Sequence, residues 1–149
     1  MINIENIKKL REETGAGILE TKEALQKNGG DYKAARKELM AKSSSKAAKK
    51  ADRDAKDGLV YAYIHTGGKS GTLVLLACET DFVAKTEDFK KLCREIALQI
   101  CAGDYADVPA VLDSEYIRDE TKKVQDLINE TIARVGEKIE LKNFCKLKV

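Results

Sequence analysis

The stretch HTGGKSG, residues 65–71, contains residue types that can cradle phosphate groups. Gly68-Lys69-Ser70 matches the end of a P-loop, in which backbone N–H groups wrap the phosphates of a nucleotide. A P-loop also needs a glycine five positions earlier, where this chain has Tyr63, and a helix directly after the motif. A β-branched and apolar run follows instead, so we expect no direct nucleotide binding.

The runs on either side of these glycines, residues 59–65 and 72–79, are predicted strands. They are apolar on both faces, which is typical of a sheet that is covered on both sides. A glycine-rich connector between two strands predicts a hairpin, in which Gly67, Gly68 and Gly71 supply left-handed turn angles.

The thiol and imidazole groups could bind a metal or act as nucleophiles. The four cysteines contain no Cys-x-x-Cys pair, and His65 is the only histidine, whereas a zinc site needs four close ligands. We therefore expect reduced cysteines that pack as small apolar residues, and no metal, cofactor or catalytic residue. A thiol enzyme that uses Cys78 or Cys145 is the alternative, and it would require a low thiolate pKa.

Composition bounds the class of partner. The chain has 149 residues, of which 27 are Lys or Arg and 25 are Asp or Glu, and it has no Trp. This balance is unusual for a nucleic-acid-binding protein, and few aromatic side chains are present to stack on bases. The sequence shows no signal peptide and no apolar stretch near the length of a membrane span, so it predicts a soluble cytoplasmic protein.

Residues 1–41 are predicted to form a three-helix module. Apolar residues three apart mark the first helix, glycines at 15, 17, 29 and 30 separate the helices, and Asp31 is suited to cap the third.

Residues 42–56 are rich in Lys and Ala and contain no large apolar residue. This segment is predicted to be a basic linker or an exposed extension of the third helix. A basic run can also touch RNA, and an RNA- or ribosome-binding protein that uses Lys46, Lys49 and Lys50 is a second hypothesis.

Residues 57–149 are predicted to form an α+β core and dimerisation domain. A helix along 89–100 and one or two helices between Ile117 and Val135 follow the hairpin, a loop at 103–114 separates them, and a strand begins near Ile139. The expected fold is thus a small three-stranded antiparallel sheet packed with helices. Little chain remains to cover the second apolar face of this sheet, which predicts an isologous homodimer.

The segment CETDFVAK, residues 78–85, follows the second predicted strand. Thr80 or Asp81 can cap a short helical turn, which places Phe82 just beyond the end of the strand. A phenylalanine there either folds back into the core or points outward as an aromatic anchor for a partner.

CETDFVAK and the following TEDFKKL resemble the signature of bacterial elongation factor Ts. So do LREETGAGILETKEAL, KAAKKADRDAKDG, the hairpin YAYIHTGGKSGTLVLLACETDFVA and the ending IARVGEKIELKNFCKLKV. The resemblance covers nearly the whole chain. It differs from longer members in having a single core unit, with only a short loop at about 103–114 where they carry a second core half or an inserted helical hairpin.

The resemblance implies a guanine-nucleotide exchange factor for elongation factor Tu, the GTPase that carries aminoacyl-tRNA to the ribosome. It implies a ubiquitin-associated-like (UBA-like) fold for the first module, whose Arg11, Ile18 and Leu19 would contact the partner's GTPase domain. It also implies that the motif at 80–83 displaces Mg²⁺ in the partner and releases GDP. The four residues of that motif are Thr80, Asp81, Phe82 and Val83.

Overall fold

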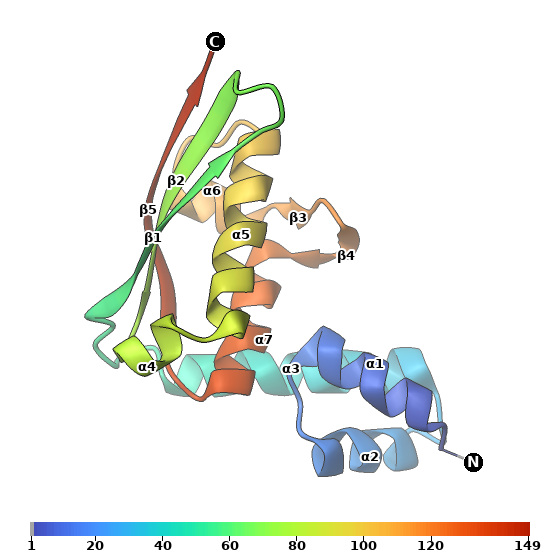
Figure 1. The fold of residues 1–149 in the computed structure, drawn as a ribbon. Helices are drawn as coiled ribbons and strands as arrows, with labels where there is room; N and C mark the ends of the chain where they lie inside the picture. Colours follow the sequence, from blue (N-terminus) through green and yellow to red (C-terminus); the bar gives the residue numbers. More distant parts are fainter. Residues whose placement is uncertain (1) are drawn as a thin grey trace.

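The computed structural model describes residues 2–149 and has the predicted α+β fold. The first three helices pack into a small bundle that projects from the rest of the molecule (Figure 1). Asp31 caps the third helix as predicted, because its carboxylate accepts hydrogen bonds from the backbone N–H groups of Lys33 and Ala34. The three helices are α1 (Ile4–Thr14), α2 (Ile18–Lys27) and α3 (Tyr32–Lys49).

Helix α3 is longer than the bundle requires. For residues 42–56 the sequence predicts either a linker or an extension of the third helix. Residues 42–49 form the extension, because Ala and Lys favour the helix and neither Gly nor Pro interrupts it. Lys46 Nζ lies 2.8 Å from Glu20 Oε2, so this basic end is partly neutralised by α2.

The main sheet contains β1 (Asp57–Ile64), β2 (Ser70–Cys78) and β5 (Ile139–Lys148), in the antiparallel order β1-β2-β5. Gly67 and Gly68 have the positive φ angles that the hairpin prediction requires. Gly71 does not, and its predicted left-handed turn angle is wrong. It lies inside β2 opposite Ile64, where a Cβ would come 2.6 Å from Cδ1 at the movable end of the exposed Ile64 side chain.

Helices α5 (Glu87–Ala102) and α7 (Val124–Val135) cover one face of the sheet (Figure 1). Apolar residues at helical spacing face the sheet, in agreement with the prediction for 89–100. The core between these layers includes Val74, Leu76, Phe89, Ile96, Ile100, Val124, Ile128 and Leu141.

Two predictions for the segment between α5 and α7 are wrong. The expected loop contains α6 (Val108–Asp113), which Asp107 caps through a 2.9 Å hydrogen bond from Ala110 N, with Pro109 in the first turn. Proline is favoured there because N–H groups in the first turn have no partner within the helix. The N–H group that proline lacks therefore costs no helical hydrogen bond.

The helix expected from Ile117 begins only at Val124. Before it, β3 (Glu115–Tyr116) and β4 (Asp119–Lys123) form a hairpin, and Ile117 lies in its turn. Gln99, buried in α5, fixes this turn because its side-chain oxygen accepts a 3.0 Å hydrogen bond from Ile117 N.

The second face of the sheet is mostly apolar and lies away from the helices (Figure 1). Residues paired across the three strands form three rows on this face, and the missing side chain of Gly71 leaves a shallow hollow in one of them. We call these residues the outer face. They are Val60, Leu75 and Asn143 in the first row, Ala62, Leu73 and Cys145 in the second, and Ile64, Gly71 and Leu147 in the third.

The C-terminal end of α1 is the point at which the helical bundle meets the core. Its last carbonyl oxygens have no partner within the helix and form the negative end of the helix dipole. Lys122 Nζ donates to Glu13 O at 2.6 Å, Arg134 Nη2 donates to Glu12 O at 2.9 Å, and Ser43 Oγ donates to Thr14 O at 2.7 Å. Two cations of the core thus complete the helix end.

A buried ion pair lies directly beneath this contact. Lys122 Nζ is 2.7 Å from Glu130 Oε1, and both side chains are less than a tenth exposed. Burial raises the pKa of Glu130 to about 7, although Lys122 opposes the shift. From the neighbouring hairpin, Asp119 accepts a 3.0 Å hydrogen bond from Arg36 of α3 and so braces the bundle from a second side.

Gly15 lies where the bundle packs closely on the core. It ends α1 at φ +72°, and a Cβ there would collide with the backbone carbonyl oxygen of Glu130 in α7. Gly29 has a similar φ of +61° and open space around it. We expect Gly29→Ala to lose about 1–2 kcal/mol of unfolding free energy from φ strain alone. Gly15→Ala should lose clearly more, because the bundle must also move away from α7.

Chemical denaturation of the two variants and the wild type measures this difference. Equal losses in the two variants would contradict a close contact between Gly15 and Glu130.

Candidate functional site

The segment CETDFVAK forms a tight turn where β2 leaves the sheet. Cys78 ends the strand, and the four-residue helix α4 (Asp81–Ala84) begins three residues later. Thr80 is the N-cap, with its backbone extended and its side-chain oxygen accepting from Val83 N at 3.4 Å. The short polar residue predicted to start this turn therefore does so.

A single carboxylate holds the turn in place. Glu137, which follows α7, accepts hydrogen bonds from Glu79 N at 3.2 Å, from Thr80 N at 3.0 Å and from Thr80 Oγ at 2.7 Å. Glu79 returns the contact by accepting from Lys138 N at 2.7 Å. This backbone hydrogen bond, aided by Arg53, lowers the pKa of Glu79. The two turns are therefore joined by reciprocal carboxylate-to-backbone bonds.

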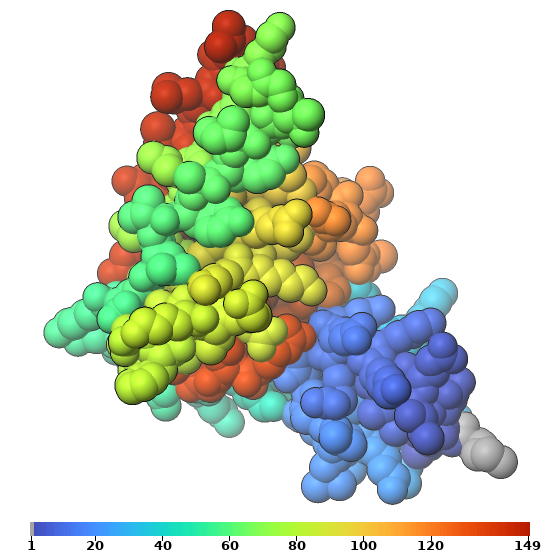
Figure 2. Space-filling view, viewed as in Figure 1, coloured from blue at the N-terminus to red at the C-terminus, as the bar shows by residue number. Residues whose placement is uncertain are grey.

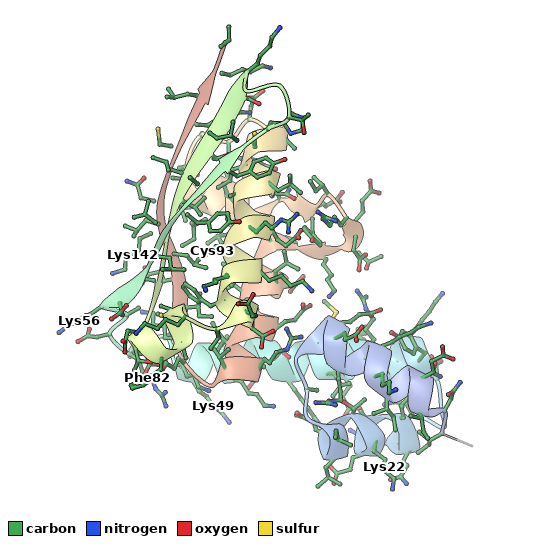
Figure 3. All side chains as sticks on the ribbon, viewed as in Figure 1. Lys22, Lys49, Lys56, Phe82, Cys93 and Lys142 are labelled. Atoms are coloured by element: carbon green, nitrogen blue, oxygen red, sulfur yellow. The ribbon has the colours of Figure 1, made fainter. Side chains whose placement is uncertain are left out.

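Phe82 points outward. Its side chain is 80% exposed, whereas Val83 and Ala84 are buried against the core. Figure 3 shows Phe82 on α4, at the lower left of the molecule. Of the two sequence-based interpretations, the buried one is wrong: the inward side of this turn is filled by Val83 and Ala84, and Phe89 of the next helix occupies the core instead.

The surroundings of Phe82 are charged but balanced. Asp81 Oδ2 lies 2.8 Å from Lys85 Nζ, one helical turn later, and this contact lowers the pKa of Asp81. The space-filling view shows the segment that contains α4, in yellow-green, as a protruding edge of the molecule (Figure 2). Phe82 is thus an apolar side chain on a projecting, well-fixed turn, beside an ion pair that leaves little net charge.

Arg11, Ile18 and Leu19 form a second surface. All three are exposed, Ile18 to 60% and Leu19 to 69%, and they lie at the end of α1 and the start of α2. The structure does not bring them together with residues 80–83. The end of α7 lies between the two surfaces, with α4 on one side and α1 on the other (Figure 1).

Sequence reasoning missed two residues that hold these surfaces, Arg134 and Glu137. Arg134 lies two residues before Gly136, and Glu137 lies directly after it. Gly136 ends α7 in the left-handed conformation. Charged residues beside such a glycine usually face solvent, so their types gave no signal. Only the positions of their partners, more than 50 residues away in the chain, reveal their contacts.

Two of the buried thiols, Cys78 and Cys93, are poorly suited to nucleophilic chemistry. Burial raises the pKa of Cys78 to about 11, with Glu137 and Asp57 adding to the shift, and burial raises the pKa of Cys93 to about 12. These shifts oppose the low thiolate pKa that a thiol enzyme would require. Within residues 2–149, His, Cys, Asp and Glu do not gather into groups of three or more that could hold a metal ion.

Within the same described residues, no helix combines the length and apolar character that crossing a membrane requires.

Comparison with known proteins identifies the family. The model of the family described as "Elongation factor TS" matches residues 79–149, which include the turn and Glu137. Elongation factor Ts of Syntrophomonas wolfei is 39% identical over 100% of this chain and 91% of its own length. Elongation factor Ts of a Thermoanaerobacter species is 38% identical over 99% and 95%, and that of Aquifex aeolicus is 41% identical over 97% and 52%.

These relatives also differ from the chain in length. The alignment with the Syntrophomonas protein runs over 194 positions, against 149 residues here, so part of that protein has no counterpart in this chain. The match nevertheless includes the whole chain and most of the relative. The chain therefore belongs to the elongation factor Ts family, a family of translation elongation factors.

Proposed function

We propose that this protein is the guanine-nucleotide exchange factor for elongation factor Tu and acts in the cytoplasm. The observation that carries the proposal is Phe82, a large apolar side chain that is 80% exposed on a turn fixed by Glu137. Such a side chain can fill a packed groove of a partner without burying an unpaired charge. Its rigid support means that little freedom is lost on binding.

The proposed mechanism acts on the metal in the partner's nucleotide site. Mg²⁺ bridges the phosphate oxygens of a bound nucleotide and neutralises their charge. Phe82 enters between two partner helices near this site, and Thr80, Asp81 and Val83 shape the turn that carries it. The displaced helices move the groups that hold Mg²⁺, the metal leaves, and GDP dissociates faster. GTP then binds the emptied site.

No covalent bond changes in this process, so it needs no general base, nucleophile or catalytic residue in this chain. Exchange is instead a coupling between two ligands of one GTPase, the nucleotide and the factor. Because such coupling is reciprocal, GDP or GTP weakens the binding of the factor as much as the factor weakens the binding of the nucleotide.

The helical bundle, which we propose to be UBA-like, supplies most of the affinity in this scheme. Ile18 and Leu19 are consecutive apolar residues, both well exposed, and Arg11 of α1 is an exposed cation. Exposed apolar side chains and an arginine have the composition of a protein-binding surface. We propose that these three residues dock on the partner's GTPase domain.

Phe82→Ala and Phe89→Ala separate function from stability. Phe82→Ala should change the unfolding free energy by less than about 0.5 kcal/mol, because the side chain is already exposed. It should nevertheless slow release of a fluorescent GDP analogue from elongation factor Tu. Phe89→Ala should lose about 3–5 kcal/mol, because Phe89 is fully buried.

Failure of the folded wild type to accelerate release from a cognate partner would overturn the exchange function. Salt-dependent binding of bulk RNA, lost on neutralising Lys46, Lys49 and Lys50, would then favour the RNA-binding hypothesis.

We also propose that the chain forms a homodimer through the outer face of its sheet. Leu73 is 48% exposed at the centre of this face, and Val60 and Leu147 on either side are 68% and 76% exposed. A contiguous apolar surface of this kind is characteristic of interaction sites. Such a face suits a second copy of this chain, because a two-fold axis places the same apolar residues on both sides of the interface.

Leu73→Glu should convert the dimer to a monomer, because it buries a carboxylate at the centre of the proposed interface. Ile117→Glu is the matched control, since Ile117 has the same 48% exposure but lies in the β3–β4 turn. Sedimentation velocity of both variants and the wild type reports the mass in solution. A monomeric wild type across the micromolar range would exclude this dimer.

A further inference from the structure

We propose that residues 134–137, the last residues of α7 and the two that follow it, couple the two partner-binding surfaces, with Arg134 and Glu137 as positioning residues. The inference rests on the proposed exchange function and deepens it. Arg134 contacts the bundle that carries Arg11, Ile18 and Leu19, and Glu137 contacts the turn that carries Phe82. Only two residues separate these contacts in the chain.

Arg134 holds the end of α1. Its Nη2 donates to Glu12 O at 2.9 Å and to Arg11 O at 3.3 Å, and its Nη1 lies 3.4 Å from Asp88 Oδ1. A guanidinium suits this position, because its rigid fork can donate to several acceptors. Its positive charge also interacts favourably with the negative C-terminal end of the α1 dipole. Arg134 therefore binds the backbone of a residue that is itself a proposed partner contact.

Glu137 holds the Phe82 turn. Gly136 ends α7 at φ +77° and turns the chain out of the helix. The carboxylate that follows accepts all three of its hydrogen bonds from Glu79 and Thr80, the residues directly before α4. A carboxylate makes stronger bonds to such donors than a neutral acceptor does. The orientation of Phe82 is thus fixed to the same short segment that fixes the bundle.

The coupling segment cannot move independently of the core. Ile128 and Ile132 of α7 are buried beneath α5 and the sheet, and Ile139 begins β5 immediately after the segment. Gly15 adds a third contact, because it allows α1 to approach the backbone of Glu130 in the same helix. The bundle, α7 and the Phe82 turn therefore form one rigid series of contacts.

A rigid link has a defined consequence for exchange. When two contacts are held at a fixed distance, forming the first raises the effective concentration of the second. Binding energy from the bundle can then be used to insert Phe82, rather than only to keep the factor attached. A loosened link leaves both surfaces intact but separates their actions.

Two variants and two controls test the link. Arg134→Met removes the contact to α1, and Arg118→Met is its control, an arginine that pairs with Glu95 on another part of the surface. Glu137→Ala removes the contact to the turn, and Glu140→Ala is its control on β5.

The measured quantity is the second-order rate constant for GDP-analogue release from elongation factor Tu at low factor concentration. We expect both variants, but neither control, to lower it by about tenfold or more, as small misplacements of a positioned group can. Glu137→Gln should retain most of the rate, because its amide oxygen still accepts from both backbone N–H groups.

Leu19→Ala provides a readout that stability alone would not move. In the wild-type background it should lower the rate constant, because the lost contact forms part of the rigid unit. In the Arg134→Met background its effect should be clearly smaller, because the bundle still binds the partner but no longer helps to place Phe82. Thermal unfolding checks that each variant is folded. Arg134→Lys, which keeps the cation but not the fork, replaces Arg134→Met if the latter is unstable.

The possible failures are distinct. A wild type that does not accelerate release overturns both the exchange function and the coupling. A wild type that does so and depends on Phe82, with Arg134 and Glu137 variants equal to their controls, overturns the coupling alone. Independent, multiplicative effects of Leu19→Ala and Arg134→Met also overturn it.

Discussion

Helix α1 ends with carbonyl oxygens that the helix itself cannot satisfy, and the groups that satisfy them determine how the bundle sits on the core. Water could serve, but it would add nothing to the packing of α3 on the core and to the Arg36–Asp119 ion pair that also hold the bundle. Here Lys122, Arg134 and Ser43 donate to these oxygens from three different elements. Because the helix dipole places partial negative charge at the same point, the two cations gain electrostatic energy as well as hydrogen bonds. A local requirement of one helix thereby contributes to the fixed arrangement of the bundle and the core.

The turn that carries Phe82 shows how an unfavourable exposure can be maintained. An exposed phenylalanine gains nothing from burial, and a four-residue helix has little stability of its own. The turn persists because its inward side, Val83 and Ala84, packs on the core and because Glu137 satisfies the N–H groups that precede it. Phe82 can therefore be kept outward at little cost to the fold. This separation of anchoring and exposed residues is what a partner-binding turn requires.

The parts of this structure that the sequence predicted are those with a repeating apolar pattern or a specific capping residue. The strands, the helix along 89–100 and the cap at Asp31 belong to this class. The β3–β4 hairpin does not, because Glu115–Tyr116 is too short to show a period, and the helical spacing from Val124 onward was extended back to Ile117. The sequence permits two interpretations of Phe82, because four residues do not define a helix face. Glu137 gave no signal, since its role depends on contacts with residues 79 and 80.

The geometry of the sheet explains how the proposed dimer and the proposed exchange function can coexist. Strands β1, β2 and β5 alternate their side chains, so the face toward α5 and α7 forms the core while the outer face presents its own apolar rows. Neither the bundle residues Arg11, Ile18 and Leu19 nor the turn at 80–83 belongs to those rows. The outer face and the proposed partner contacts are therefore made of different residues. Each copy keeps its own bundle, coupling segment and Phe82 turn, so one dimer can engage two GTPase molecules.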